Sequence, residues 1–252
     1  MSTDATCEGV ERVVARVITR VIALETSGRL GSLAAVSVES SNGGSHVEVV
    51  GRLSLPHDRR TAQSLLPTLT ALLEACRWRV GELDLVCTTT GPGSFTGLRV
   101  GVTTAKTLAY ATGAKLVGVH TLAAIAAAVG AATGQVWAIL DAQRQELFAA
   151  RFQPGWQNES DRLPETLVIG VDDWLDQLRA GDVVSGPPLE KLSGRLPPHV
   201  RTVDASLWSP TAKVVARLGI AGLERGETID PMQLVPHYFR KSAAEEKAKT
   251  KR

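Results

Sequence analysis

Hydrophobic and polar residues alternate in three segments near the start of the chain, which is typical of β-strands. The segments are 17–24, 32–38 and 46–53, and the third alternates most clearly (HVEVVGRL). The links between them, ETSGRLG and ESSNGGS, are rich in turn-forming residues. The pattern therefore predicts an antiparallel meander of three strands.

A helical period replaces the alternation after the meander. We expect a helix from about Thr61 to Arg77, a short apolar strand at 84–90, and a second helix at 98–111 that ends at Gly113. The apolar stripe of the first helix consists of Leu65, Leu69, Leu72 and Cys76. Three strands, a helix, a strand and a helix follow one another in the order of the ribonuclease-H-like fold.

The second half repeats the start of the first. The stretch VIALETSGRLGSLAAV (21–36) parallels WAILDAQRQELFAARF (137–152), and in each an apolar strand ends in a carboxylate, Glu25 or Asp141. Two copies predict an α/β protein with a two-lobed, duplicated ribonuclease-H-like fold, the plan of the actin-like (ASKHA) ATPases and sugar kinases. In that plan a last helix, expected at 210–223, returns to the first lobe.

The elements divide the chain into expected domains. These are a disordered leader at 1–16, a first lobe at 17–113 completed by about 210–231, a second lobe at 114–209, and a charged tail at 241–252. The second lobe is expected to contain strands at 115–119, 135–141 and 146–152 and a helix at 120–129.

Charge and cysteine content narrow the function classes. The 28 Lys and Arg against 26 Asp and Glu give a net charge of +2, but the last twelve residues hold five of the positive and two of the negative charges. The remainder is almost neutral, which argues against an autonomous nucleic-acid-binding protein. Three cysteines without CxxC spacing favour a reducing compartment, and no apolar run reaches the length of a membrane span. We therefore expect a cytoplasmic protein.

The turn GPGSFTG lies between a strand and a helix, where phosphate-binding loops often occur. It lacks the Lys-Ser/Thr pair of a Walker A loop, so it is either an anion-binding turn or only a tight corner. Its glycines allow backbone angles that other residues avoid, and Ser94 or Thr96 can cap the helix. The residues of this structural or anion-binding loop are Gly91, Pro92, Gly93, Ser94, Phe95, Thr96, Gly97 and Arg99.

Small side chains recur at every fourth position of the helix after that turn. A strip of this kind allows a close approach either to the chain's own sheet or to a helix of a partner chain. We interpret it as part of a partner interface. The interface candidates are Leu65, Leu69, Leu72, Gly97, Leu98, Gly101, Val102, Ala105 and Ala109.

Catalytic chemistry has little support in the sequence. Glu25, Thr26, Ser27, Gly28 and Asp141 occupy the positions of phosphate and magnesium contacts in actin-like ATPases, so they are candidates for a vestigial nucleotide site. The second half has no clear glycine-rich adenosine loop. The five histidines form no HxxxH or HExxH pair, so we expect no metal site and no catalytic residue.

Several motifs together resemble the TsaB (YeaZ) family of tRNA threonylcarbamoyladenosine biosynthesis proteins. The resemblance runs from about residue 17 to 240 and is most specific at GPGSFTGLRVG. The other matching stretches are VIALETS, TAQSLLPTL (61–69), KLVGVHTLAAIA (115–126), ILDAQRQELFAARF (139–152) and PHYFRKSAAEEK (236–247).

The resemblance implies a scaffold without activity of its own. Members of the family form a heterodimer with the transferase TsaD, which carries the metal, and work with the small ATPase TsaE. The complex transfers threonylcarbamoyl to N6 of adenosine 37 in tRNAs that read codons beginning with A. The helices matching 61–77 and 98–111 would form the interface with TsaD, and tRNA would be reached through the complex. Binding of ATP or ADP at that interface, and a homodimer of the isolated chain, are left open.

The sequence departs from the family at some positions. Thr61-Ala62-Gln63 replaces the usual His-containing segment, Glu25 replaces an aspartate, and the leader is additional. Two alternatives are an autonomous ATP-dependent phosphotransferase, suggested by the duplicated lobes, and a metallopeptidase, for which the scattered histidines give no support.

Overall fold

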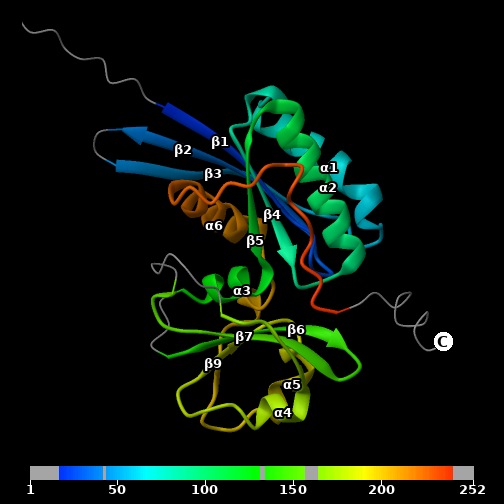
Figure 1. The fold of residues 1–252 in the computed structure, drawn as a ribbon, viewed down its shortest axis with the longest axis vertical. Coiled ribbons are helices and arrows are strands. Elements are labelled where there is room, and N and C mark those ends of the chain that lie inside the picture. The colour runs from blue at the N-terminus through cyan, green and yellow to red at the C-terminus, as the bar shows by residue number, and fades with distance from the viewer. Residues whose placement is uncertain (1–16, 42–43, 131–133, 157–163, 241–252) are drawn as a thin grey trace, which may run out of the picture.

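Two five-stranded sheets form the centres of two lobes, one above the other in Figure 1. The computed structural model describes residues 17–41, 44–130, 134–156 and 164–240. The leader expected at 1–16 and the tail expected at 241–252 lie outside these residues. Among the described helices, none is long and apolar enough to cross a membrane.

The first sheet has the strand order β3-β2-β1-β4-β5. Its strands are β1 (Val17–Glu25), β2 (Ser32–Ser41), β3 (Gly44–Ser54), β4 (Leu85–Gly91) and β5 (Lys115–His120). The first three pair antiparallel, which confirms the predicted meander, and β4 and β5 join in parallel. Apolar side chains therefore face both sides of the sheet, and each side needs a covering layer.

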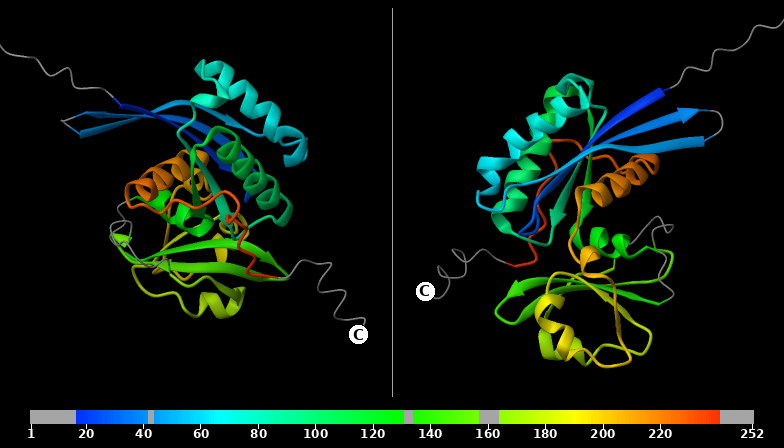
Figure 2. Two further views of the ribbon diagram at one scale, coloured as in Figure 1. Left: turned by 45° about the horizontal axis from the view of Figure 1, so that its top comes forward. Right: turned by 180° about the vertical axis from the view of Figure 1, so that it is seen from behind.

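Helices cover both faces of this sheet. The helices α1 (Thr61–Cys76) and α2 (Phe95–Thr112) pack on one face, and α6 (Ala212–Glu224) covers the other, as Figure 2 shows from two sides. Gly113 ends α2 in the left-handed conformation, as the sequence predicts. The contacts of α6 with β1, β2, β4 and β5 confirm that the last helix returns to the first lobe.

The boundary between the lobes differs from the expected one. The sequence predicted that the second lobe starts at residue 114, but β5 pairs with β4 in the first sheet. The reason is the crossover through α2, because a parallel strand that follows a helix usually returns beside the strand it left. The next helix, α3 (Thr121–Val129), packs against β6 of the second lobe and also contacts α6.

The second sheet repeats the topology of the first, in the order β8-β7-β6-β9-β10. Its strands are β6 (Val136–Gln143), β7 (Glu146–Phe152), β8 (Leu167–Gly170), β9 (Val183–Ser185) and β10 (Arg201–Thr202). Here too a central strand has an antiparallel neighbour and a parallel one. This shared order confirms the predicted duplication. The short helices are α4 (Val171–Leu175), α5 (Leu189–Leu192), and the 3-10 turns η1 (Val80–Glu82), η3 (Ser193–Arg195) and η4 (Ala205–Leu207).

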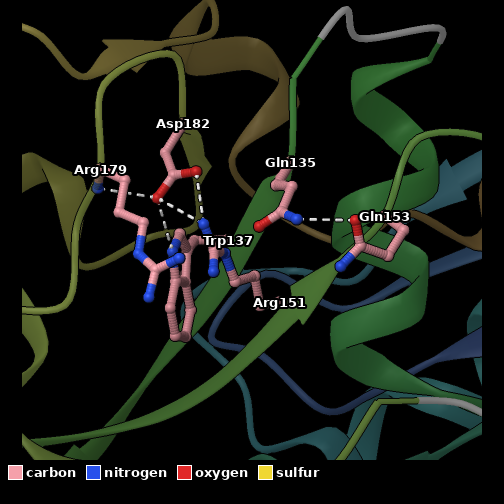
Figure 3. A network of polar contacts seen from close by, with 6 residues as sticks. All are labelled: Gln135, Trp137, Arg151, Gln153, Arg179 and Asp182. Carbon is pink, nitrogen blue, oxygen red and sulfur yellow. Dashed lines mark hydrogen bonds and ion pairs between the residues drawn. The ribbon is translucent and has the colours of Figure 1, made fainter.

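A buried carboxylate fixes β9 beside β6 (Figure 3). Asp182 is 3% exposed and accepts hydrogen bonds from the indole of Trp137 at 3.1 Å, the guanidinium of Arg151 at 3.0 Å and the backbone N–H of Arg179 at 3.0 Å. The sequence did not single out this residue. Pro187, which lines a cleft of the molecule, follows β9 closely in the chain, so the network also helps to position that part of the cleft wall.

Candidate functional site

A cleft of about 710 Å³ opens between the two lobes. Its walls are the turn after β1, the loop before α2, the hairpin between β6 and β7, and a C-terminal segment at 232–240 that we call the strap. The residues lining it are Ser27, Gly28, Arg29, Pro92, Gly93, Ser94, Phe95, Leu140, Asp141, Ala142, Gln143, Arg144, Phe148, Pro187, His237, Tyr238, Phe239 and Arg240.

The loop before α2 is a tight corner, as one of the two readings of the sequence predicts. Gly91 and Gly93 have φ values of 126° and 150°, and the peptide bond between Gly91 and Pro92 is cis. A Cβ at Gly93 would lie 2.5 Å from the carbonyl oxygen of Ser27, which accepts a hydrogen bond from the Ser94 N–H at 2.7 Å. The Ser94 hydroxyl accepts from the Gly97 N–H at 3.2 Å and caps α2. An anion at this turn stays a prediction.

The strip of small residues on α2 faces the chain's own sheet, so its assignment to a partner interface is wrong. A Cβ at Gly97 would run into the carbonyl oxygen of Thr26, and one at Gly101 into the Thr26 hydroxyl. All nine interface candidates are buried in the first lobe. At Gly97 and Gly101, helix α2 touches Thr26, the residue that follows β1, and that close approach requires small side chains.

Replacing Gly101 with alanine should therefore destabilise the isolated chain. We expect the free energy of unfolding to fall by about 1–3 kcal/mol because the added methyl group overpacks the contact with Thr26. Urea denaturation measures the change. Gly81→Ala is the matched control, since nothing lies within 4 Å of its added Cβ. Unchanged stability of Gly101→Ala would mean that α2 does not pack against Thr26 as described.

The vestigial-site candidates separate into two groups. Ser27, Gly28 and Asp141 line the cleft, whereas Glu25 and Thr26 are 0% and 1% exposed inside the first lobe. One oxygen of Glu25 accepts from the N–H of Ser27 at 2.8 Å and from its hydroxyl, but the other has no hydrogen-bond partner among the described residues. Burial raises the pKa of Glu25 to about 7, although the hydrogen bonds from Ser27 and Gly28 lower it in part.

The second acid, Asp141, stands at the root of a strained hairpin. It is exposed and accepts a hydrogen bond from the Gln143 N–H at 2.7 Å. Gln143, Arg144 and Gln145 have φ values of 67°, 57° and 61°, a left-handed conformation that costs about 1 kcal/mol for each residue with a side chain. Asp141 and Arg144 of this hairpin both line the cleft.

The strap crosses from the first lobe to the second, and sequence reasoning gave it no role. The His237 N–H donates to the Thr90 carbonyl at 2.7 Å, and the Tyr238 ring lies 4.5 Å from that of Phe95. At its end, Arg240 donates to the carbonyl of Ala142 and pairs with Glu146 on the hairpin. Two adjacent aromatic residues, Tyr238 and Phe239, in a chain with only 4% aromatic residues, are the sequence feature that could have indicated a role for the strap.

One histidine lies under the strap. The Nε2 of His120 is 3.0 Å from the Thr166 hydroxyl, and burial together with the nearby His237 lowers the pKa of His120 to about 4. Within the described part of the chain, no three His, Cys, Asp or Glu side chains come close enough together to hold a metal ion.

The outward sides of α1 and α2 form a second candidate surface, which we call the α1–α2 face. It consists of Leu66, Thr70, Thr103, Thr107 and Tyr110, all exposed and uncharged. Leu66 is 58% and Tyr110 is 75% exposed. Large exposed hydrophobic side chains are typical of protein–protein contact surfaces.

Comparison with a protein-family model and with related proteins identifies the family of this chain. The model described as TsaD, tRNA N6-adenosine threonylcarbamoyltransferase, matches residues 55–194, more than half of the chain. The tRNA threonylcarbamoyladenosine biosynthesis protein TsaB of Bacillus subtilis (strain 168) is 28% identical over 193 residues, which are 72% of this chain and 80% of that protein. The protein of the same name from Escherichia coli (strain K12) is 26% identical and covers 89% of this chain and 96% of that one.

A solved structure agrees at the level of the fold. YeaZ from Pseudomonas aeruginosa superposes with a TM-score of 0.68 and 24% identity, over 88% of this chain and 100% of that chain. The topology, the motifs and the relatives agree with one another. The chain therefore belongs to the family of this sequence model and, within it, to the TsaB/YeaZ proteins.

Proposed function

We propose that this chain acts in the biosynthesis of tRNA threonylcarbamoyladenosine as a scaffold subunit without activity of its own. It would be the heterodimer partner and activator of a TsaD-type transferase and work together with a TsaE-type ATPase. The modified position would be adenosine 37 of tRNAs that read codons beginning with A. The names of the relatives from Bacillus subtilis and Escherichia coli support the pathway.

The α1–α2 face is the observation that carries the scaffold role. None of its five residues is charged, and Leu66 and Tyr110 are large exposed hydrophobic residues on two helices that contact each other. Burying these side chains against a partner helix would remove apolar area from water without desolvating a charge. The proposed partner surface thus uses the same two helices as the original hypothesis, but their opposite sides.

The position of Glu25 supports a role without catalysis. An acid that positions magnesium must be ionised and reach the cleft, whereas Glu25 is buried and has a pKa of about 7. In our proposal the isolated chain therefore holds no nucleotide. Binding of ATP or ADP would take place at the interface with the TsaD-type partner.

The double variant Leu66→Asp with Tyr110→Asp tests the proposed interface. We expect it to weaken binding to a TsaD-type partner at least about 30-fold, the effect of losing an interface hot spot, and to leave the stability of the isolated chain nearly unchanged. Calorimetry measures the affinity. Mass spectrometry of tRNA nucleosides from the reconstituted reaction measures the activation.

Val47→Asp is the matched control for this test. Val47 is 49% exposed and belongs to β3, so it is not one of the residues of the α1–α2 face. Partner binding by the double variant with wild-type affinity would refute the proposed interface. Modified adenosine formed equally well without this chain would refute the scaffold role. If the isolated chain proves to form a homodimer, we expect the same double variant to be monomeric.

A further inference from the structure

Two kinds of connection join the lobes, and they lie on different sides of the molecule. On one side α3 follows β5 without a loop and packs against α6, where the Arg217 guanidinium donates to the Ala127 carbonyl. On the other side the end of the strap crosses the cleft, whose described lining includes no residue of α3 or α6 (Figures 1 and 2). The strap therefore ties the lobes together on the side where the cleft separates them.

The first part of the strap is anchored on the first lobe. Leu234 is 3% exposed in the core that α1 and α2 cover, and the Lys106 ammonium donates to the Met232 carbonyl at 3.4 Å. The Arg99 Nε donates to the Tyr238 hydroxyl at 3.0 Å. These contacts hold the strap on the first lobe as far as Tyr238.

The next two residues are anchored on the second lobe. The Phe239 ring packs against the core of that lobe. Arg240 donates to the Ala142 carbonyl and forms an ion pair with Glu146, so it contacts both strands of the β6–β7 hairpin. The strap thus passes from one lobe to the other within a single peptide link, the one between Tyr238 and Phe239.

The contacts of Arg240 differ from those of an ordinary surface ion pair. The side chains of Arg240 and Glu146 are only 23% and 34% exposed, so solvent screens their attraction less than that of fully exposed charges. Hydrogen bonds to a charged group each change an equilibrium constant by about a factor of ten or more. Lobes of one chain move relative to each other unless such contacts hold them.

We propose that residues 237–240 of the strap act as a latch that keeps the two lobes closed over the cleft. When the latch is broken, the second lobe swings away from the first about the contact between α3 and α6. A latch differs from an ordinary stabilising contact, because its loss changes the angle between the lobes and leaves each lobe folded. The inference concerns the isolated chain and does not depend on the proposed function.

Distance measurement by pulsed electron spin resonance tests the latch. Nitroxide labels on two introduced cysteines, Glu74→Cys on α1 and Glu190→Cys on α5, report the separation of the lobes from exposed positions. The three cysteines of the chain are replaced by alanine in this parent protein. We expect Arg240→Glu, which puts two negative charges side by side, to raise the ratio of long to short distances at least about tenfold.

Exchange of the two charges distinguishes a latch from a general loss of stability. Arg240→Glu combined with Glu146→Arg restores the attraction and should bring back most of the short distances. Arg195→Glu is the control, because Arg195 pairs with Asp172 inside the second lobe, so its loss breaks an ion pair that the strap does not share. It should leave the distances unchanged.

Urea unfolding establishes that each labelled variant is folded. Unchanged distances in a folded Arg240→Glu chain would overturn the inference, and so would equal opening by Arg195→Glu or failure of the charge exchange to restore the short distances. If Arg240→Glu does not fold, Arg240→Lys takes its place. Lysine keeps the charge but lacks the planar fork of donors, so it should open the cleft to a smaller extent, and unchanged distances would again overturn the latch.

Discussion

Replacing Asp182 with alanine should lower the free energy of unfolding by about 3 kcal/mol, the lower end of the range for breaking a buried ion pair. The loss of stability comes from the buried hydrogen-bond donors that no longer have the Asp182 carboxylate as acceptor. Arg151 has a side chain only 26% exposed, and Trp137 is 3% exposed, so neither regains full hydration when the carboxylate is removed. The Arg179 N–H also loses its acceptor.

Urea denaturation followed by tryptophan fluorescence suits this measurement. Trp137 and Trp174 pack edge to face in the second lobe with ring centroids 6.5 Å apart, so their emission reports on the region that Asp182 supports. Asp182→Asn should have a smaller effect than Asp182→Ala, because the amide oxygen can still accept a hydrogen bond after the charge is lost.

Asp172→Ala provides the contrast. Asp172 pairs with Arg195, but the two side chains are 83% and 50% exposed, and such surface pairs contribute about 0–1 kcal/mol. Equal effects of Asp172→Ala and Asp182→Ala would show that the network in Figure 3 does not hold β9 in place.

Patterns within a few residues predicted the fold well. Alternation, turn residues and the glycine after α2 identified β1, β2, β3, α1 and α2 to within a few residues. The repeat of VIALETS and WAILDAQ located β6 and β7 and revealed the duplication. These features are encoded locally, because each strand or helix in these regions carries its own period and its own turn.

Features that depend on distant pairing were not predictable in the same way. The strands β8, β9 and β10 have only two to four residues each, too few to show a period. The strap has no regular secondary structure, and its position depends on contacts such as that between the His237 N–H and the Thr90 carbonyl. The assignment of β5 to the wrong lobe has the same cause.

The strip of small residues on α2 shows why a correct pattern can lead to a wrong prediction of the partner surface. A strip of small residues every fourth position predicts close packing, and close packing is what the structure shows. The strip does not say which neighbour approaches. Here the turn after β1 does, with Thr26 against Gly97 and Gly101, so the accessible sides of α1 and α2 are the ones that carry Leu66 and Tyr110.

The second large effect concerns Glu25, whose replacement by glutamine should stabilise the chain at alkaline pH. The pKa of Glu25 is about 7 in the folded chain, raised from 4.5. A raised pKa means that its contribution to stability is fully present below pH 4.5 and is lost as the pH rises through 7. A shift of that size corresponds to about 3 kcal/mol.

Glutamine at this position is neutral at every pH but keeps an oxygen that can accept from Ser27. Thermal and urea unfolding should therefore show similar stability of Glu25→Gln and the wild type at about pH 5, and a gain of up to about 3 kcal/mol for the variant at about pH 8.5. Glu82→Gln is the control. Hydrogen bonding to the Arg79 backbone lowers the pKa of Glu82, so this carboxylate is ionised at both pH values and its loss should act equally at both.

The same variant separates the scaffold from the ATP-dependent phosphotransferase. If Glu25 positions magnesium, Mg-ATP should stabilise the wild type strongly at alkaline pH, because the bound cation would compensate the buried charge, and it should have little effect on Glu25→Gln. If Glu25 has only a structural role, Mg-ATP should change the unfolding midpoints of the wild type and of Glu25→Gln by the same amount. Only the pH-dependent gain in stability of the variant should then remain. A buried, partly protonated acid that lacks a cation partner among the described residues leads us to expect the second result, which would assign Glu25 to the support of the Ser27 turn rather than to phosphate chemistry.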